Sequence, residues 1–168
     1  SPSLFGFPAD FQSFSAQRLF TAVNSNITDV RFYLPGTTTA ATTSAFGVVF
    51  TDVETANQTM LQFFDSTDTL IYTRAVLATG NHELSFLGAT VTGGSISRVR
   101  ITAGLNTISA NGTLGNPNDD VVAIDDFIYA EPAATSSVPE PASLSLLALA
   151  LFGLGVSRRV AGRPLRLR

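Results

Sequence analysis

Short apolar runs separated by turn residues occupy most of the first 130 positions of the chain. Within residues 45–53 the large apolar side chains alternate with smaller ones, so Phe46, Val48 and Phe50 would share one face of an extended strand. Pairs such as Pro35-Gly36 and Asn111-Gly112 mark the breaks between the runs. The pattern predicts eight strands, at residues 18–23, 29–34, 45–53, 59–65, 69–76, 83–91, 96–101 and 121–130.

Eight short strands in about 115 residues are typical of a jelly-roll-like β-sandwich, which we expect over residues 18–131. Residues 1–17 would form an N-terminal segment and residues 35–44 an exposed low-complexity loop. Residues 132–138, which are small residues and Pro, predict a linker. In residues 96–101, Arg98 and Arg100 would face away from the core. The expected core consists of large apolar side chains: Phe46, Val48, Phe50, Leu61, Phe63, Phe86, Val99, Ile101 and Ile124.

The C-terminal region has a different pattern. The segment Ala142–Val156 carries no charge, and Pro139 and Pro141 precede it, so we expect a short apolar helix that begins after them. Fifteen helical residues reach about 22 Å, less than the roughly 30 Å of a bilayer core, which favours a transient membrane span. An alternative is a buried helix of a globular domain, but the segment lacks the polar face that such a helix shows.

Basic residues follow this apolar segment with no acid among them: Arg158, Arg159, Arg163, Arg166 and Arg168. Positive residues beside a span stay in the cytoplasm, which places residues 1–137 on the other side of the membrane. Because the sequence begins with Ser1 rather than Met, we expect either a trimmed N-terminal signal peptide or a fragment.

Residues 139–168 resemble a PEP-CTERM sorting signal. Pro139-Glu140-Pro141, the apolar segment and the Arg158-Arg159 pair occur in the order and at the spacing of that signal, and only the extra AGRPLRLR at residues 161–168 makes the tail longer than usual. The resemblance implies recognition by an exosortase, a membrane protease-transpeptidase of Gram-negative bacteria that make extracellular polysaccharide. It therefore implies export, a transient inner-membrane span, and delivery to the cell surface or the extracellular matrix of a biofilm. Proteins labelled ice-binding also carry such tails.

The β region has a resemblance of its own. AFGVVFTDVE, LQFFD, LSFLGATV, ISRVRI and VVAIDDFIYAEP together resemble the uncharacterised β-sandwich domain that often precedes PEP-CTERM tails. AIDDF also resembles the last strand of MAM-type and carbohydrate-binding jelly rolls. These resemblances imply the fold more than a ligand.

Charge divides the chain into two parts. Five arginines and twelve acids precede Pro139, a net charge of −7, whereas five arginines and one acid in the tail give +4. An acidic domain repels phosphate backbones, which excludes nucleic acid as a partner, and it attracts cations. The sequence contains no cysteine, which excludes disulfides and zinc-thiolate sites.

Two aspartate pairs, Asp119-Asp120 and Asp125-Asp126, are the candidate metal ligands. Adjacent strand residues face opposite sides, so one of Asp125 and Asp126 would point inward and would need an arginine, several backbone donors or a metal ion. One interpretation is a calcium ion bound by these aspartates and by backbone carbonyls. The other is that one aspartate pairs with an arginine (Arg31, Arg98 or Arg100) or caps loop amides, while the other is solvated.

Catalytic residues are scarce in this chain. It has no Cys, no Lys and no G-x-S-x-G, and its single histidine, His82, follows Gly80-Asn81, where we expect an exposed turn. We therefore expect a non-catalytic protein that binds extracellular polysaccharide, although three Tyr and no Trp are few side chains for stacking on sugars. The alternatives are a hydrolase that uses paired carboxylates and an ice-binding protein.

Overall fold

The computed structural model describes residues 10–16, 18–92, 95–116 and 118–135, and these contain strands but no helix. The strands are β1 Ile27–Tyr33, β2 Ala40–Thr42, β3 Ala45–Thr51, β4 Met60–Phe64, β5 Leu70–Ala75, β6 Leu84–Thr90, β7 Arg98–Thr102, β8 Ala123–Tyr129 and β9 Ala133–Ala134. In these ranges no helix is long and apolar enough to cross a membrane. The expected span Ala142–Val156 lies outside them.

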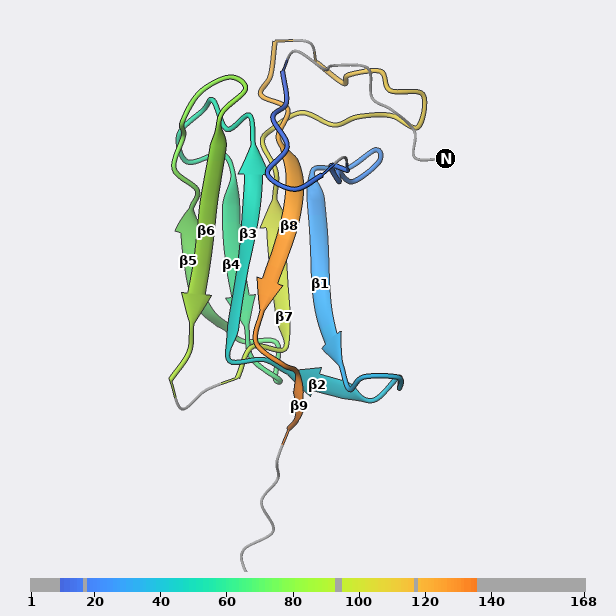
Figure 1. Cartoon of the computed structure of the whole chain (residues 1–168), viewed down its shortest axis with the longest axis vertical. Coiled ribbons are helices and arrows are strands. Elements are labelled where there is room, and N and C mark those ends of the chain that lie inside the picture. The colour runs from blue at the N-terminus through green and yellow to red at the C-terminus, as the bar shows by residue number, and fades with distance from the viewer. Residues whose placement is uncertain (1–9, 17, 93–94, 117, 136–168) are drawn as a thin grey trace, which may run out of the picture. The chain divides into compact units, whose positions relative to one another are not determined.

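The strands form two antiparallel sheets. One sheet has the order β5-β4-β7-β1-β2-β9 and the other the order β6-β3-β8. Figure 1 shows β6, β3 and β8 in one layer, with β5, β4, β7 and β1 behind them. The predicted two-sheet, all-β architecture is confirmed for the described residues.

The core lies between the layers, because the two-residue period of the strands turns one set of side chains toward the opposite sheet. Phe46, Val48 and Phe50 of β3 are at most 2 % exposed. They pack with inward residues of β4, β7 and β8, namely Leu61, Phe63, Val99, Ile101 and Ile124. Eight of the nine expected core residues are therefore buried.

Phe86 is the exception, and its placement in the core was wrong. Its side chain is 58 % exposed, because β6 pairs with β3 in a register that sets Phe86 opposite Val49 on the outer face. Ser85 occupies the inward position, and its hydroxyl donates to the Leu77 carbonyl at 2.7 Å. The Phe86 ring instead covers Gly47, where an added Cβ would lie 2.7 Å from the ring.

Three segments differ from the predicted elements. Residues 18–23 form no continuous strand and contribute isolated bridges, such as Phe20 to Ile124. The expected loop 35–44 contains β2, whose Ala41 is 2 % exposed. Ala133 and Ala134, expected in the linker, form β9 and pair with β2. Small residues give too weak an apolar pattern for either short strand to be recognised from sequence.

The outward arginines of β7 form an ion-pair network on the larger sheet. Arg100 binds both carboxylate oxygens of Asp29 at 2.8 Å, and Arg98 binds Asp29 at 3.3 Å and Asp68 at 2.7 Å. The Arg98 guanidinium lies 3.7 Å from the Phe64 ring centroid, which accounts for its burial on this face. The hydrogen bond from Arg100 lowers the pKa of Asp29.

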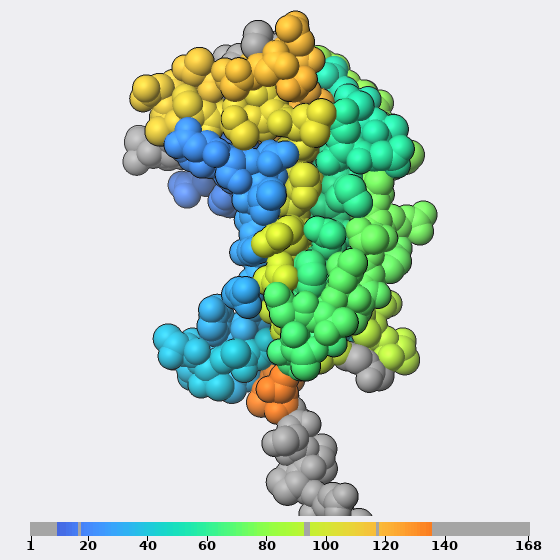
Figure 2. All heavy atoms as spheres, turned by 180° about the vertical axis from the view of Figure 1, so that it is seen from behind, coloured from blue at the N-terminus to red at the C-terminus, as the bar shows by residue number. Residues whose placement is uncertain are grey.

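Residues 103–116 and 118–119 form a cap at one end of the sandwich, beside the segment that leads into β1 (Figure 2). Asn106 organises this cap. Its Oδ1 accepts from the Thr107 and Asn116 amides at 2.8 and 3.0 Å, and its Nδ2 donates to the Asn116 and Asp119 carbonyls. Gly104 has φ +62° and packs against the Asp120 carbonyl, which holds the cap against the start of β8.

We predict that Gly104→Ala destabilises the protein more than Gly36→Ala. Both glycines have left-handed backbones, with φ +62° and +72°, so alanine costs roughly 1 kcal/mol at each. Only at Gly104 would the new Cβ overlap backbone, at the Asp120 carbonyl oxygen, which adds about 1–3 kcal/mol. Urea unfolding of both variants measures the difference, and equal free energies of unfolding would contradict this packing.

Candidate functional site

Three carboxylates gather at the end of the sandwich where β3 ends and β8 begins. Asp52 and Glu54 follow β3, Asp120 precedes β8, and each offers an oxygen within 4.8 Å of the others. Asp52 and Asp120 are buried, whereas Glu54 is exposed. Figure 1 shows these strand ends on the same side of the molecule. We call Asp52, Glu54 and Asp120 the carboxylate triad.

Asp52 is fixed by the connection between β5 and β6. Its backbone has φ +69°, a left-handed conformation that Asp tolerates better than most residues. Its amide donates to the Glu83 carbonyl at 3.0 Å, and its Oδ1 accepts from the His82 amide at 3.0 Å. His82 itself is exposed in a turn, as predicted.

Asp120 connects the triad to the cap. Its Oδ2 accepts from the amides of Glu54 at 3.2 Å and Thr55 at 3.0 Å. Its backbone carbonyl accepts from the Leu105 and Asn106 amides. The side chain is buried, with the residue 6 % exposed, and within the described chain its Oδ1 has no hydrogen-bond partner.

Burial and nearby negative charge favour the neutral forms of Asp52 and Asp120. The pKa of Asp52 is raised to about 6, chiefly by burial and also by the negative charges of Glu54, Asp120 and Asp10, while the hydrogen bond from the His82 amide opposes the rise. Burial likewise raises the pKa of Asp120, although the Thr55 and Glu54 amides oppose the rise. Such a concentration of negative charge is suited to a cation.

The aspartates of β8 lie elsewhere. Asp125 is 1 % exposed, and its carboxylate accepts from the amides of Phe14 and Ser15 and from the Ser15 hydroxyl at 3.0 Å. The same hydroxyl lies 3.1 Å from Asp126. Asp125 therefore attaches residues 10–16 to the outer face of the smaller sheet, where Gln12 also donates to Thr51. Backbone donors therefore satisfy this buried aspartate, which lies on the outer face rather than pointing inward.

Of the four aspartates predicted to bind calcium, Asp120 alone belongs to the triad. Asp119 is half-buried, and its backbone bonds to Asn116 and Asn106. Calcium binding by all four stays a prediction. The sequence-based reasoning missed Asp52 and Glu54, because nothing local relates the end of β3 to Asp120, which lies 66 positions after Glu54.

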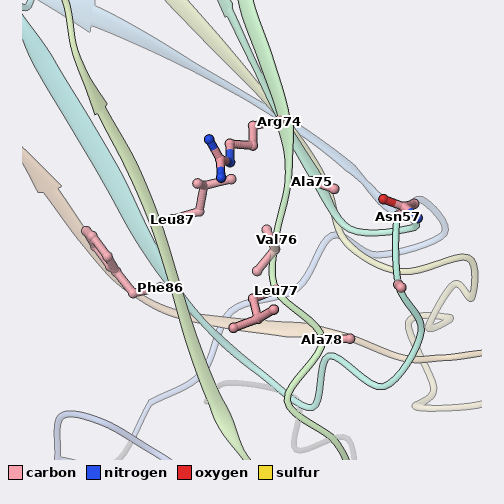
Figure 3. Close-up of a pocket in the computed structure, with 9 residues that line it drawn as sticks. Asn57, Arg74, Ala75, Val76, Leu77, Ala78, Phe86 and Leu87 are labelled. Atoms are coloured by element: carbon pink, nitrogen blue, oxygen red, sulfur yellow. The ribbon is translucent and has the colours of Figure 1, made fainter.

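The exposed Phe86 ring lies between two shallow hollows. One, of about 400 Å³, opens between β5 and β6 and is lined by Ala56, Asn57, Arg74, Ala75, Val76, Leu77, Ala78, Phe86 and Leu87. The other, of about 480 Å³, lies on the smaller sheet and is lined by Ala45, Phe46, Gly47, Phe86, Gly88, Ala89, Thr90, Ile128, Tyr129 and Ala130. Figure 3 shows Arg74 and Leu87 reaching into the first hollow, while Phe86 points to the other side of β6.

Arg74 gives the first hollow a positive charge. The side chain is exposed on β5, and its guanidinium lies 3.5 Å from the Tyr72 hydroxyl, an interaction that raises the pKa of Arg74. The ion pairs found among the described residues involve Arg98 and Arg100 instead. Arg74 and Phe86 thus place a cation and a ring on opposite sides of one strand.

Comparison with known proteins identifies the tail. Residues 137–159 match the PEP-CTERM protein-sorting motif, and this match covers the predicted Pro139-Glu140-Pro141 triplet, the apolar segment and the Arg158-Arg159 pair. These residues lie outside the described part of the structure. No curated protein and no solved structure matches the chain.

We predict that Asp125→Ala lowers the free energy of unfolding by about 2 kcal/mol, because the amides of Phe14 and Ser15 lose a charged, buried acceptor. Amide hydrogen exchange at these two residues should become faster as the segment detaches. Asp126→Ala is the matched control, since Ser15 keeps its bonds to Asp125. Equal effects of the two substitutions would contradict the assigned role of Asp125.

Proposed function

We propose that this chain is an exported protein whose jelly-roll-like β-sandwich binds extracellular polysaccharide without catalysis, at the cell surface or in the matrix of a Gram-negative bacterium. The motif at residues 137–159 indicates sorting by an exosortase, with transit through the membrane. The charge distribution supports this direction of transport, because the acidic domain precedes the apolar segment and the arginines follow it.

We predict that the mature protein ends near Pro139–Pro141 and lacks the arginines from Arg158 onward. An exosortase would cut close to the triplet and leave the apolar segment and its basic end in the membrane. Mass spectrometry of the protein recovered from the cell surface or the medium gives the mature C-terminus. A mature chain that still carries Arg158–Arg168 would refute processing, and replacing Pro139-Glu140-Pro141 by alanines should retain the full-length chain.

Phe86 is the observation that supports polysaccharide binding. A 58 % exposed aromatic ring on a paired strand gives a flat, rigid apolar surface, against which the C–H face of a sugar ring can pack. Phe86 lines both hollows, so a chain that crosses β6 from one hollow to the other would pass over the ring. Arg74 in the first hollow favours an anionic polysaccharide.

We predict that Phe86→Ala weakens binding to polysaccharide at least about tenfold, the effect of losing one ring contact worth about 1.4 kcal/mol. Phe14→Ala is the matched control, because Phe14 is similarly exposed, at 62 %, and lines neither hollow. A glycan array followed by titration with the full chain in non-ionic detergent measures both variants. Equal loss in the two, or no binding by the wild type, would refute the proposal.

The carboxylate triad gives the hydrolase alternative a specific form. Asp52, with a pKa raised to about 6 by burial, has the property of a general acid beside the carboxylate of Asp120. A turnover assay on the same polysaccharides distinguishes the two functions. Hydrolysis that disappears in Asp52→Asn would replace the binding proposal with the enzymatic one, and thermal hysteresis in ice growth would replace it with the ice-binding one.

A further inference from the structure

The Oδ1 atom of Asp120 is a buried acceptor that nothing in the described chain satisfies. Its partner oxygen Oδ2 binds two amides, so the carboxylate is held in place while Oδ1 stays without a donor. Buried polar atoms in native proteins nearly always have a partner, which can be protein, water or an ion. The orphan oxygen therefore points to a bound species outside the described part of the chain.

The surroundings of this oxygen determine the charge of that species. Asp52 and Glu54 bring two further carboxylates, and each of the three side chains offers an oxygen within 4.8 Å of the others. The paired arginines, Arg98 and Arg100, bind Asp29 and Asp68 on the larger sheet. A cation beside Asp120 would both complete its coordination and reduce the repulsion among three acids.

We propose that the carboxylate triad binds a calcium ion, with Oδ1 of Asp120 as a buried ligand, Asp52 as a second and Glu54 as a third. The set offers oxygen alone, without the nitrogen and sulfur ligands that zinc favours. The exposed Glu54 side chain leaves the site open to solvent, from which water supplies the remaining ligands. Open sites on extracellular modules bind calcium with dissociation constants of roughly 0.1–1 mM.

The ion would link loops of the chain that are far apart in sequence. Asp52 contacts the turn before β6 through the His82 amide, and Asp120 contacts the cap through Leu105 and Asn106. Because these contacts exist only in the folded protein, calcium would bind the folded state alone and would raise the melting temperature with concentration.

Thermal unfolding of the full chain in non-ionic detergent, followed by circular dichroism, tests the site. The wild type should melt several degrees higher in millimolar calcium than in EDTA, and equimolar magnesium should produce at most a small part of this rise. Equal midpoints in calcium and EDTA would overturn the site. An equal rise with magnesium would overturn its assignment to calcium.

Variants locate the ion. Asp52→Asn and Asp120→Asn should abolish the rise, since asparagine keeps the shape of the side chain and tolerates the left-handed backbone at residue 52. Glu54→Gln changes an exposed side chain and should fold normally, yet weaken calcium binding about tenfold in titration calorimetry. Asp119→Asn is the matched control. Loss of the rise in Asp119→Asn, or its retention in Asp120→Asn and Glu54→Gln, would overturn the assignment.

Discussion

The irregular pairing of β3 with β8 determines where the polar groups of this sandwich lie. Val48 pairs with Phe127 and Phe50 pairs with Ile124, so two β8 residues, Asp125 and Asp126, oppose the single residue between them on β3. The bulge lets Ile124 and Phe127, which are three positions apart, both pair with β3 residues whose side chains face the core, Phe50 and Val48. In a regular ladder residues three positions apart face opposite sides of the sheet, whereas Asp125, next to Ile124, faces outward.

The outward aspartate then requires a cover, which the N-terminal segment supplies. Residues 10–16 bring two amides and a hydroxyl to Asp125, and Gln12 adds a bond to Thr51 of β3. Phe20 continues this contact by bridging to Ile124 on the free side of β8. Residues 18–23 do not form the regular strand expected from the sequence, because they bond to a bulged strand at separate points rather than along its length.

Sequence alone identified most of the core because burial follows a local period. Phe46, Val99 and Ile101 alternate with polar or small residues, and the structure buries all of them. Residues 84–90 are ambiguous, since a serine and a phenylalanine compete for the inward position. The serine occupies it because its hydroxyl meets the Leu77 carbonyl, a partner that no sequence window contains.

The carboxylate triad was harder to predict from sequence, again because its members come from distant parts of the chain. Asp120 was recognised as a candidate ligand, but its partners follow a strand that lies more than sixty positions earlier in the chain. Proximity of this kind depends on which strand ends meet at one end of the sandwich. The PEP-CTERM tail is the opposite case, because its triplet, apolar segment and arginines are contiguous and can be recognised without any fold.

The triad and the Phe86 surface are connected through the start of β6. His82 donates its amide to Asp52 four positions before Phe86, and the Val53 carbonyl accepts from Thr79 and Gly80 in the same connection. That connection follows Leu77 and Ala78, which line the first hollow. An ion that orders Asp52 would therefore reduce motion in the chain that shapes the hollow and would hold the Phe86 ring in place. The two proposed ligands would then favour the same conformation, which is how separate sites in one small domain become thermodynamically linked.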